Sequence, residues 1–163
     1  MLVKTLAAAL LFPLLTSAAY AQDVTLPPAG AKARYTVSGE GVQIYLCTTT
    51  GKWALQEPQA KLVDPKTEQP VGTHSKGPIW TWSDGSILLG DVLQQKPSPD
   101  SIPWLLLSVT STGKKGALSD IAYVRRSDTQ GGIVPSSVLC GSNNTDETLR
   151  VPYAATYTFY TAK

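Results

Sequence analysis

The chain contains one histidine, His74, in the segment VGTHSKGPIWTWSDGS at positions 71–86. Histidine titrates near neutral pH, so it serves as an acid–base catalyst or as a metal ligand. A hydrolase could use a nearby hydroxyl, such as that of Ser75 or Ser86, as its nucleophile. Asp84 could then orient the imidazole, although the chain has no G-x-S-x-G turn to present a serine. His74 is therefore a candidate for acid–base chemistry, for ligand contact, or for a structural hydrogen bond.

The residue content argues against metal and nucleotide cofactors. Transition-metal sites use several imidazole or thiolate ligands, and beside His74 the chain has two cysteines, Cys47 and Cys140. Calcium could bind loop carboxylates, but no D-x-D-x-D spacing is present. The segment SGEGVQI at 38–44 begins like a dinucleotide-binding loop, yet it lacks the third glycine and leads into a predicted strand. We expect no cofactor and no metal, and we reject a nicotinamide-dependent dehydrogenase.

Trp80 and Trp82 are separated by one residue in a predicted strand, so both indoles project from the same face. Such a pair either fills a core between sheets or forms an exposed platform on which sugar rings stack. Core packing is favoured, because Trp53 and Trp104 could supply partners. If the platform is exposed, the predicted ligand-binding residues are Trp80, Trp82, His74 and Asp84.

The first 21 residues have the layout of a signal peptide. Lys4 provides the positive start, residues 6–15 an apolar run, and Ala21 ends an A-x-A cleavage motif. The run is too short to span a bilayer, so we expect no transmembrane anchor. The mature protein is then expected to be secreted or periplasmic. In an oxidising compartment Cys47 and Cys140 are expected to form a disulfide, which would stabilise the fold by about 4–5 kcal/mol.

The distribution of charged residues argues against nucleic acid as a partner. The chain has 14 Lys and Arg against 12 Asp and Glu, interspersed without a basic stripe, so nucleic-acid binding is not expected. Arg125 and Arg126 are adjacent, and we interpret them as the solvated end of a strand. Asn143 begins a glycosylation sequon that matters only if the host glycosylates exported proteins.

Short alternating segments predict an all-β fold. Glycine and proline recur along the chain and argue against long helices. About eight to ten short strands predict one β-sandwich or β-barrel, with a flexible arm and first strand at 22–40 and the β domain at 41–163. The segment 57–72 has three prolines and is expected to form an edge strand within long loops. The best strand candidates are 41–48, 79–82, 102–110, 120–126 and 151–161.

The order of several motifs resembles a family of exported bacterial and fungal proteins that carry a domain of unknown function. The motifs are IYLC, GKWALQEPQAKLVD, VGTHSKGPIWTWSDGS, IPWLLL, YVRRSDTQGG and VPYAATYTFY. The resemblance covers roughly residues 41–160 and implies an exported, mostly β domain with a cysteine pair. It supplies no catalytic residue. Some fungal members have been labelled malate dehydrogenase, a label that conflicts with the incomplete glycine motif at 38–44.

These observations predict an exported β protein that acts outside the cytoplasm as a surface or binding protein. Carbohydrate or cell-envelope material is the expected ligand, contacted by Trp80 and Trp82. One alternative is a small secreted hydrolase that uses His74 as its acid–base group. Another is a purely structural or stress-related envelope protein. Solvent accessibility of the two tryptophans and His74 distinguishes these hypotheses.

Overall fold

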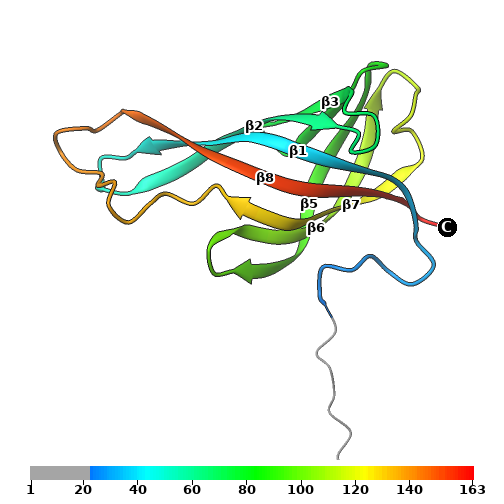
Figure 1. Cartoon of the computed structure of the whole chain (residues 1–163), viewed down its shortest axis with the longest axis horizontal. Coiled ribbons are helices and arrows are strands. Elements are labelled where there is room, and N and C mark those ends of the chain that lie inside the picture. Colours follow the sequence, from blue (N-terminus) through cyan, green and yellow to red (C-terminus); the bar gives the residue numbers. More distant parts are fainter. Residues whose placement is uncertain (1–22) are drawn as a thin grey trace, which may run out of the picture.

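Eight antiparallel strands close into one barrel in the computed structural model, which describes residues 23–163 (Figure 1). Each strand pairs with the strands before and after it, and the last strand pairs with the first. The strands are β1 (Lys32–Cys47), β2 (Trp53–Val63), β3 (Pro70–Ser75), β4 (Ile79–Trp82), β5 (Ser86–Ser98), β6 (Ser101–Gly113), β7 (Ile121–Gly131) and β8 (Thr148–Thr161). The all-β prediction is confirmed, with the barrel in place of the sandwich. The predicted signal peptide lies outside the described residues.

The expectation of an edge strand at 57–72 is wrong. This segment contributes to β2, which lies between β1 and β3, and to β3, which lies between β2 and β4. Residues 57–59 of β2 pair with β1 alone, since pairing with β3 begins at Ala60. The prolines are accommodated locally. Pro70 is the first residue of β3, and Pro58 lies in β2 opposite Gln43, close to a bulge at Gln56 of the same strand.

The interior of the barrel is built from alternate residues of its strands. In β8 the predicted inward face is confirmed, because all five of its members are buried: Val151, Tyr153, Ala155, Tyr157 and Phe159. Leu62, Leu88 and Val124 pack with this face in one core cluster. Near the middle of β6, the adjacent Leu106 and Leu107 are both buried, as the continuous apolar run predicts.

The segment 114–120 closes one end of the barrel. It joins β6 to β7, and Leu118 from this segment is fully buried in the core cluster. The Leu118 amide donates to the Ser86 hydroxyl at 3.3 Å, and the Ala117 amide donates to a carboxylate oxygen of Asp84 at 2.6 Å. These bonds satisfy backbone donors that the turn would otherwise leave unpaired.

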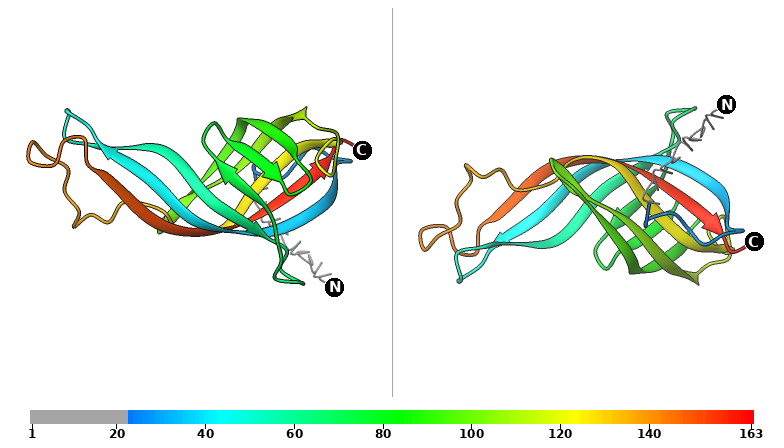
Figure 2. Two further views of the ribbon diagram at one scale, coloured as in Figure 1. Left: turned by 90° about the horizontal axis from the view of Figure 1, so that it is seen from above. Right: turned by 90° about the horizontal axis from the view of Figure 1, so that it is seen from below.

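At the other end, β1, β2 and β8 run beyond the remaining strands, towards the left of Figure 1 and of the left view in Figure 2. The predicted disulfide is present there. Cys47 at the end of β1 is bonded to Cys140 in the connection between β7 and β8, with Cα atoms 5.4 Å apart. It fastens this connection to the end of β1.

Residues 23–31 precede β1. The Asp23 carboxylate lies 2.9 Å from Arg125 and 3.6 Å from Lys96, and Thr25 is buried. β1 runs continuously across the expected division between residues 40 and 41. Flexibility of this arm stays a prediction.

Candidate functional site

His74 lies in the barrel interior, near the end of β3. Its imidazole is 4 % exposed and stacks on the indole of Trp80, with ring centroids 4.6 Å apart. The Tyr157 ring contacts it from another side at 5.2 Å. Nδ1 lies 2.9 Å from the Ile79 carbonyl oxygen. Because a carbonyl only accepts, the neutral ring carries its proton on Nδ1 and leaves Nε2 as an acceptor.

Burial lowers the pKa of His74 to about 4. The bond to Ile79 opposes this shift, and the positive charge of Arg126 adds to it. The imidazole is therefore neutral at neutral pH. The single hydrogen bond that the His74 side chain makes within residues 23–163 goes to backbone, so no serine or carboxylate is arranged with it as in a catalytic triad.

Trp80 and Trp82 project from the same face of β4, and that face points inward. Trp80 is 1 % exposed and meets Phe159 edge-on at 6.3 Å. Gly90 makes room for this indole, because a Cβ there would lie 2.8 Å from Trp80 Cζ3. Trp82 is half-buried between Tyr35 at 5.3 Å and Phe159 at 5.4 Å. Trp80 is therefore a core residue and forms no exposed platform.

Asp84 and Asn143 are both exposed, and neither lies beside His74. Asp84 accepts hydrogen bonds from the backbone and hydroxyl of Ser86 and from the Ala117 amide, which hold its pKa at about 2. It organises the turn between β4 and β5. Asn143 lies in the connection between β7 and β8. Its glycosylation stays a prediction.

A cavity of about 410 Å³ lies at the mouth of the barrel, towards the end that Leu118 does not close. Three polar side chains on its wall are buried: Gln43 of β1, His74 of β3 and Arg126 of β7. Three exposed apolar side chains lie on its outer rim, Leu55, Val92 and Ile133, beside the exposed Gln56 and Gln95. An apolar lining with a few converging polar groups is the usual composition of a small-molecule site.

Arg126 is 9 % exposed, and both of its side-chain hydrogen bonds go to one backbone oxygen. Nε and Nη2 donate to the Pro103 carbonyl at 3.0 and 2.8 Å. The ladder between β6 and β7 is interrupted between Ser101 and Leu105, which leaves that carbonyl free to accept. The expectation that Arg125 and Arg126 form a solvated strand end is wrong, because both lie in the middle of β7, Arg126 is buried and Arg125 is half-buried. Adjacent strand residues face opposite sides, and Arg126 is the inward one.

Gln43 is almost completely buried at 1 % exposure. Its Oε1 has no hydrogen-bond partner within residues 23–163, a condition shared only with Nε1 of Trp80 among buried side-chain atoms there. An unpaired buried polar atom costs about 1–3 kcal/mol. Tyr45, two residues further along β1, donates from its phenol to the Gly132 carbonyl at 2.6 Å. The cavity thus combines a buried cation, an unpaired amide oxygen and a neutral imidazole.

His74 was predicted as a site residue because it is the only histidine in the sequence, whereas Gln43, Tyr45 and Arg126 were not predicted. In the segment 41–48 the alternation is visible, but the polar members, Gln43 and Tyr45, line the cavity. The signal that could have identified Arg126 is its position next to Arg125. Two adjacent arginines in a strand cannot both face solvent when one side of the sheet is the barrel interior.

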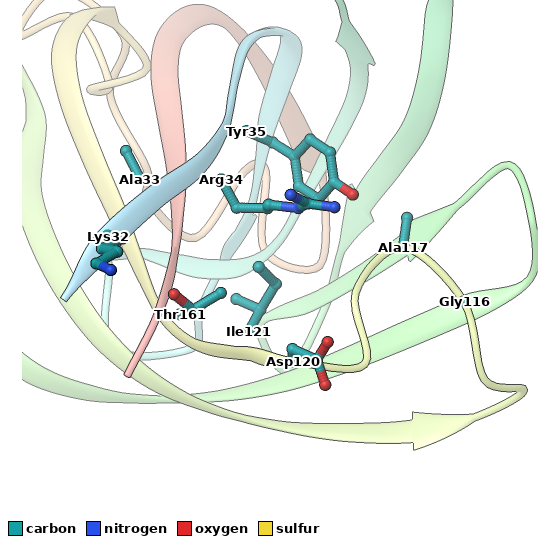
Figure 3. Close-up of a pocket in the computed structure, with 9 residues that line it drawn as sticks. All are labelled: Lys32, Ala33, Arg34, Tyr35, Gly116, Ala117, Asp120, Ile121 and Thr161. Carbon is teal, nitrogen blue, oxygen red and sulfur yellow. The ribbon is translucent and has the colours of Figure 1, made fainter. Parts of the chain in front are cut away.

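A second groove, of about 460 Å³, lies near the closed end, between the start of β1 and the segment 116–121 (Figure 3). Arg34 reaches over the Tyr35 ring, with its guanidinium carbon 5.6 Å from the centroid. Lys32 and Arg34 are exposed, and the groove holds no unpaired buried polar atom of the described residues. It is a weaker candidate than the cavity at the mouth.

An antiparallel meander of eight strands that closes on itself is an up-and-down β-barrel, a class whose mouth can hold one small ligand. The chain belongs to a family described as protein of unknown function (DUF3455), whose model matches residues 28–161. This confirms the resemblance to a family with a domain of unknown function. No curated protein and no solved structure matches the chain. Within residues 23–163 no helix is long and apolar enough to cross a membrane.

Proposed function

We propose that this protein is an exported, extracytoplasmic binding protein that holds a small amphipathic molecule in the cavity at its barrel mouth. The observation that carries the proposal is the pairing of buried polar groups, Gln43 and Arg126, with an exposed apolar rim. Such a cavity can bury an apolar body and satisfy a polar head at once. Its volume, about 410 Å³, lies within the usual range for small-molecule sites.

Export is supported by the signal-like layout of residues 1–21 and by the bond between Cys47 and Cys140. Cell-envelope material includes many molecules with an apolar body, so it suits this cavity. Carbohydrate is less favoured, because the buried Trp80 offers no surface on which a sugar ring could stack. The neutral and enclosed His74 gives a hydrolase no evident acid–base group at neutral pH.

The proposal is tested with the neutral fluorescent probe N-phenyl-1-naphthylamine. We expect saturable binding, with the emission enhancement of an apolar site. Val92→Trp places an indole at the rim of the cavity, so the variant should bind the probe about tenfold more weakly, a change of about 1.4 kcal/mol.

Leu139→Trp is the matched control, because Leu139 is 79 % exposed, more than any other large apolar side chain of residues 23–163, and lies outside the cavity lining. It should bind the probe as the wild type does. Equal affinity of all three proteins would place the probe elsewhere and overturn the assignment of the site. Absence of binding would favour a purely structural envelope role.

A further inference from the structure

We propose that the ligand of this cavity carries a carboxylate, and that the guanidinium of Arg126 binds it. This inference rests on the proposed function and adds the chemical class of the ligand. It starts from the charge of the cavity. Arg126 is buried at 9 % exposure, and an arginine keeps its charge at any physiological pH.

Arg126 has no ionic partner within the described chain. The two ion pairs of residues 23–163 both use Asp23, whose partners are Lys96 and Arg125. Glu57 lines the same cavity, but it is half-buried in β2 and accepts a hydrogen bond from Gln59 at 3.3 Å. A buried charge without a counter-charge is costly, which makes this site favourable for an anion.

Arg125 is the natural comparison for Arg126, since it is the adjacent residue of β7. It faces outward, donates to the Asp23 carboxylate at 2.9 Å and lies over the Trp104 ring at 5.2 Å. The outward arginine thus has a carboxylate partner from this chain, whereas the inward one has only a backbone oxygen. A ligand carboxylate would complete the same pairing inside the barrel.

The donors for such a pairing are present. A guanidinium has five N–H groups, and the Pro103 carbonyl accepts two bonds from it. Both N–H groups of Nη1 and the second N–H of Nη2 remain, and Nη1 and Nη2 together can make a bidentate bond to a carboxylate. Gln43 adds an amide without a partner for its oxygen, which can rotate to present its NH₂ to the anion.

The apolar rim indicates what is attached to the carboxylate. Leu55, Val92 and Ile133 are exposed around the cavity, and burying them against a hydrocarbon body is favourable. A small polar acid would leave this rim in water. The combination fits an amphipathic carboxylic acid with an aliphatic or aromatic body.

The test measures displacement of N-phenyl-1-naphthylamine by decanoate and by decanol, which share their hydrocarbon chain. A hydrogen-bonded charge pair predicts that the wild type binds decanoate about tenfold to hundredfold more tightly than decanol. Arg126→Gln should reduce this preference to about twofold or less. Arg125→Gln removes the same charge from the outer face and should keep the preference of the wild type.

If the probe binds and the two competitors displace it equally from the wild type, the carboxylate inference is overturned and the proposed function stands. If Arg126→Gln keeps the preference, the inference is likewise overturned. Should Arg126→Gln fail to fold, the comparison of decanoate with decanol on the wild type still decides the question. If no probe binds, the proposed function itself fails.

Discussion

His74, Gln43 and Arg126 are three buried polar side chains that share one cavity wall, beside a core cluster that is apolar and aromatic. The three side chains differ in charge and in hydrogen bonding. His74 is neutral and bonded to the Ile79 carbonyl, Arg126 is charged and bonded to a backbone oxygen, and Gln43 lacks a partner for its oxygen. Polar groups without full pairing usually persist in a core where function requires them.

Protonation of His74 predicts a pH-dependent loss of stability. The pKa is about 4 in the folded protein and 6.5 in the unfolded chain, so the unfolded state binds a proton first as pH falls. The contribution of neutral His74 to the free energy of unfolding is complete above pH 6.5. It falls by about 3 kcal/mol by pH 4. Chemical denaturation at pH 7 and pH 4 measures the difference in free energy of unfolding.

His74→Phe serves as the comparison, since it keeps a ring beside Trp80 and cannot titrate. Its free energy of unfolding should change less between the two pH values than that of the wild type, by about 3 kcal/mol. Asp84 has a folded pKa of about 2 and an ordinary pKa of 3.8, so its contribution to stability is lost only as pH falls below about 3.8. It therefore changes little between pH 7 and pH 4. Identical pH profiles for wild type and variant would show that His74 is accessible to protons in the folded state.

The segment 114–120 determines which end of the barrel stays available. Leu118 fills the core from that side, and Asp84 and Ser86 hold the backbone of the segment. The sequence marks Asp84 as a candidate for chemistry, but its carboxylate organises turns at the closed end. The cavity with Arg126 lies further along β1, beside Gln43 and Tyr45.

Truncation of Leu118, which closes one end of the barrel, should destabilise the fold. Leu118→Ala leaves a void in a fully buried position and is expected to lower the free energy of unfolding by about 2–5 kcal/mol. Leu139→Ala, at a position that is 79 % exposed, should change it by less than about 0.5 kcal/mol. Urea denaturation of both variants checks this pair, and a Leu118→Ala protein as stable as Leu139→Ala would show that the segment does not close the core.

Individual strands were largely predictable because period-two alternation and turn residues are local signals. The segments 102–110, 120–126 and 151–161 all lie within or largely within observed strands. The edge strand at 57–72 was predicted wrongly because the prolines are a local signal, whereas the pairing of β2 with β1 and of β3 with β4 is not contained in the segment itself. Closure of the sheet through β8 and β1, at opposite ends of the chain, is equally absent from any local pattern.

At the scale of the whole molecule, closure also explains why most of the site escaped prediction. The sequence shows which residues alternate, but the face that becomes the interior is decided only when the sheet curves into a barrel. Trp80 and His74 were grouped in one candidate site, and the structure pairs them across β3 and β4, while their role in binding stays a prediction. Gln43 and Arg126 come from distant strands, and only the barrel brings them to one cavity.

The most direct test of the proposed binding site is amide chemical-shift mapping of the isotopically labelled protein during titration with N-phenyl-1-naphthylamine. We expect saturable shifts that concentrate at Tyr45, His74, Val92 and Ile133 around the barrel mouth. Residues 114–121 at the closed end should change little. Shifts confined to that closed end, or no saturable shifts at any probe concentration, would contradict a ligand site at the mouth of this barrel.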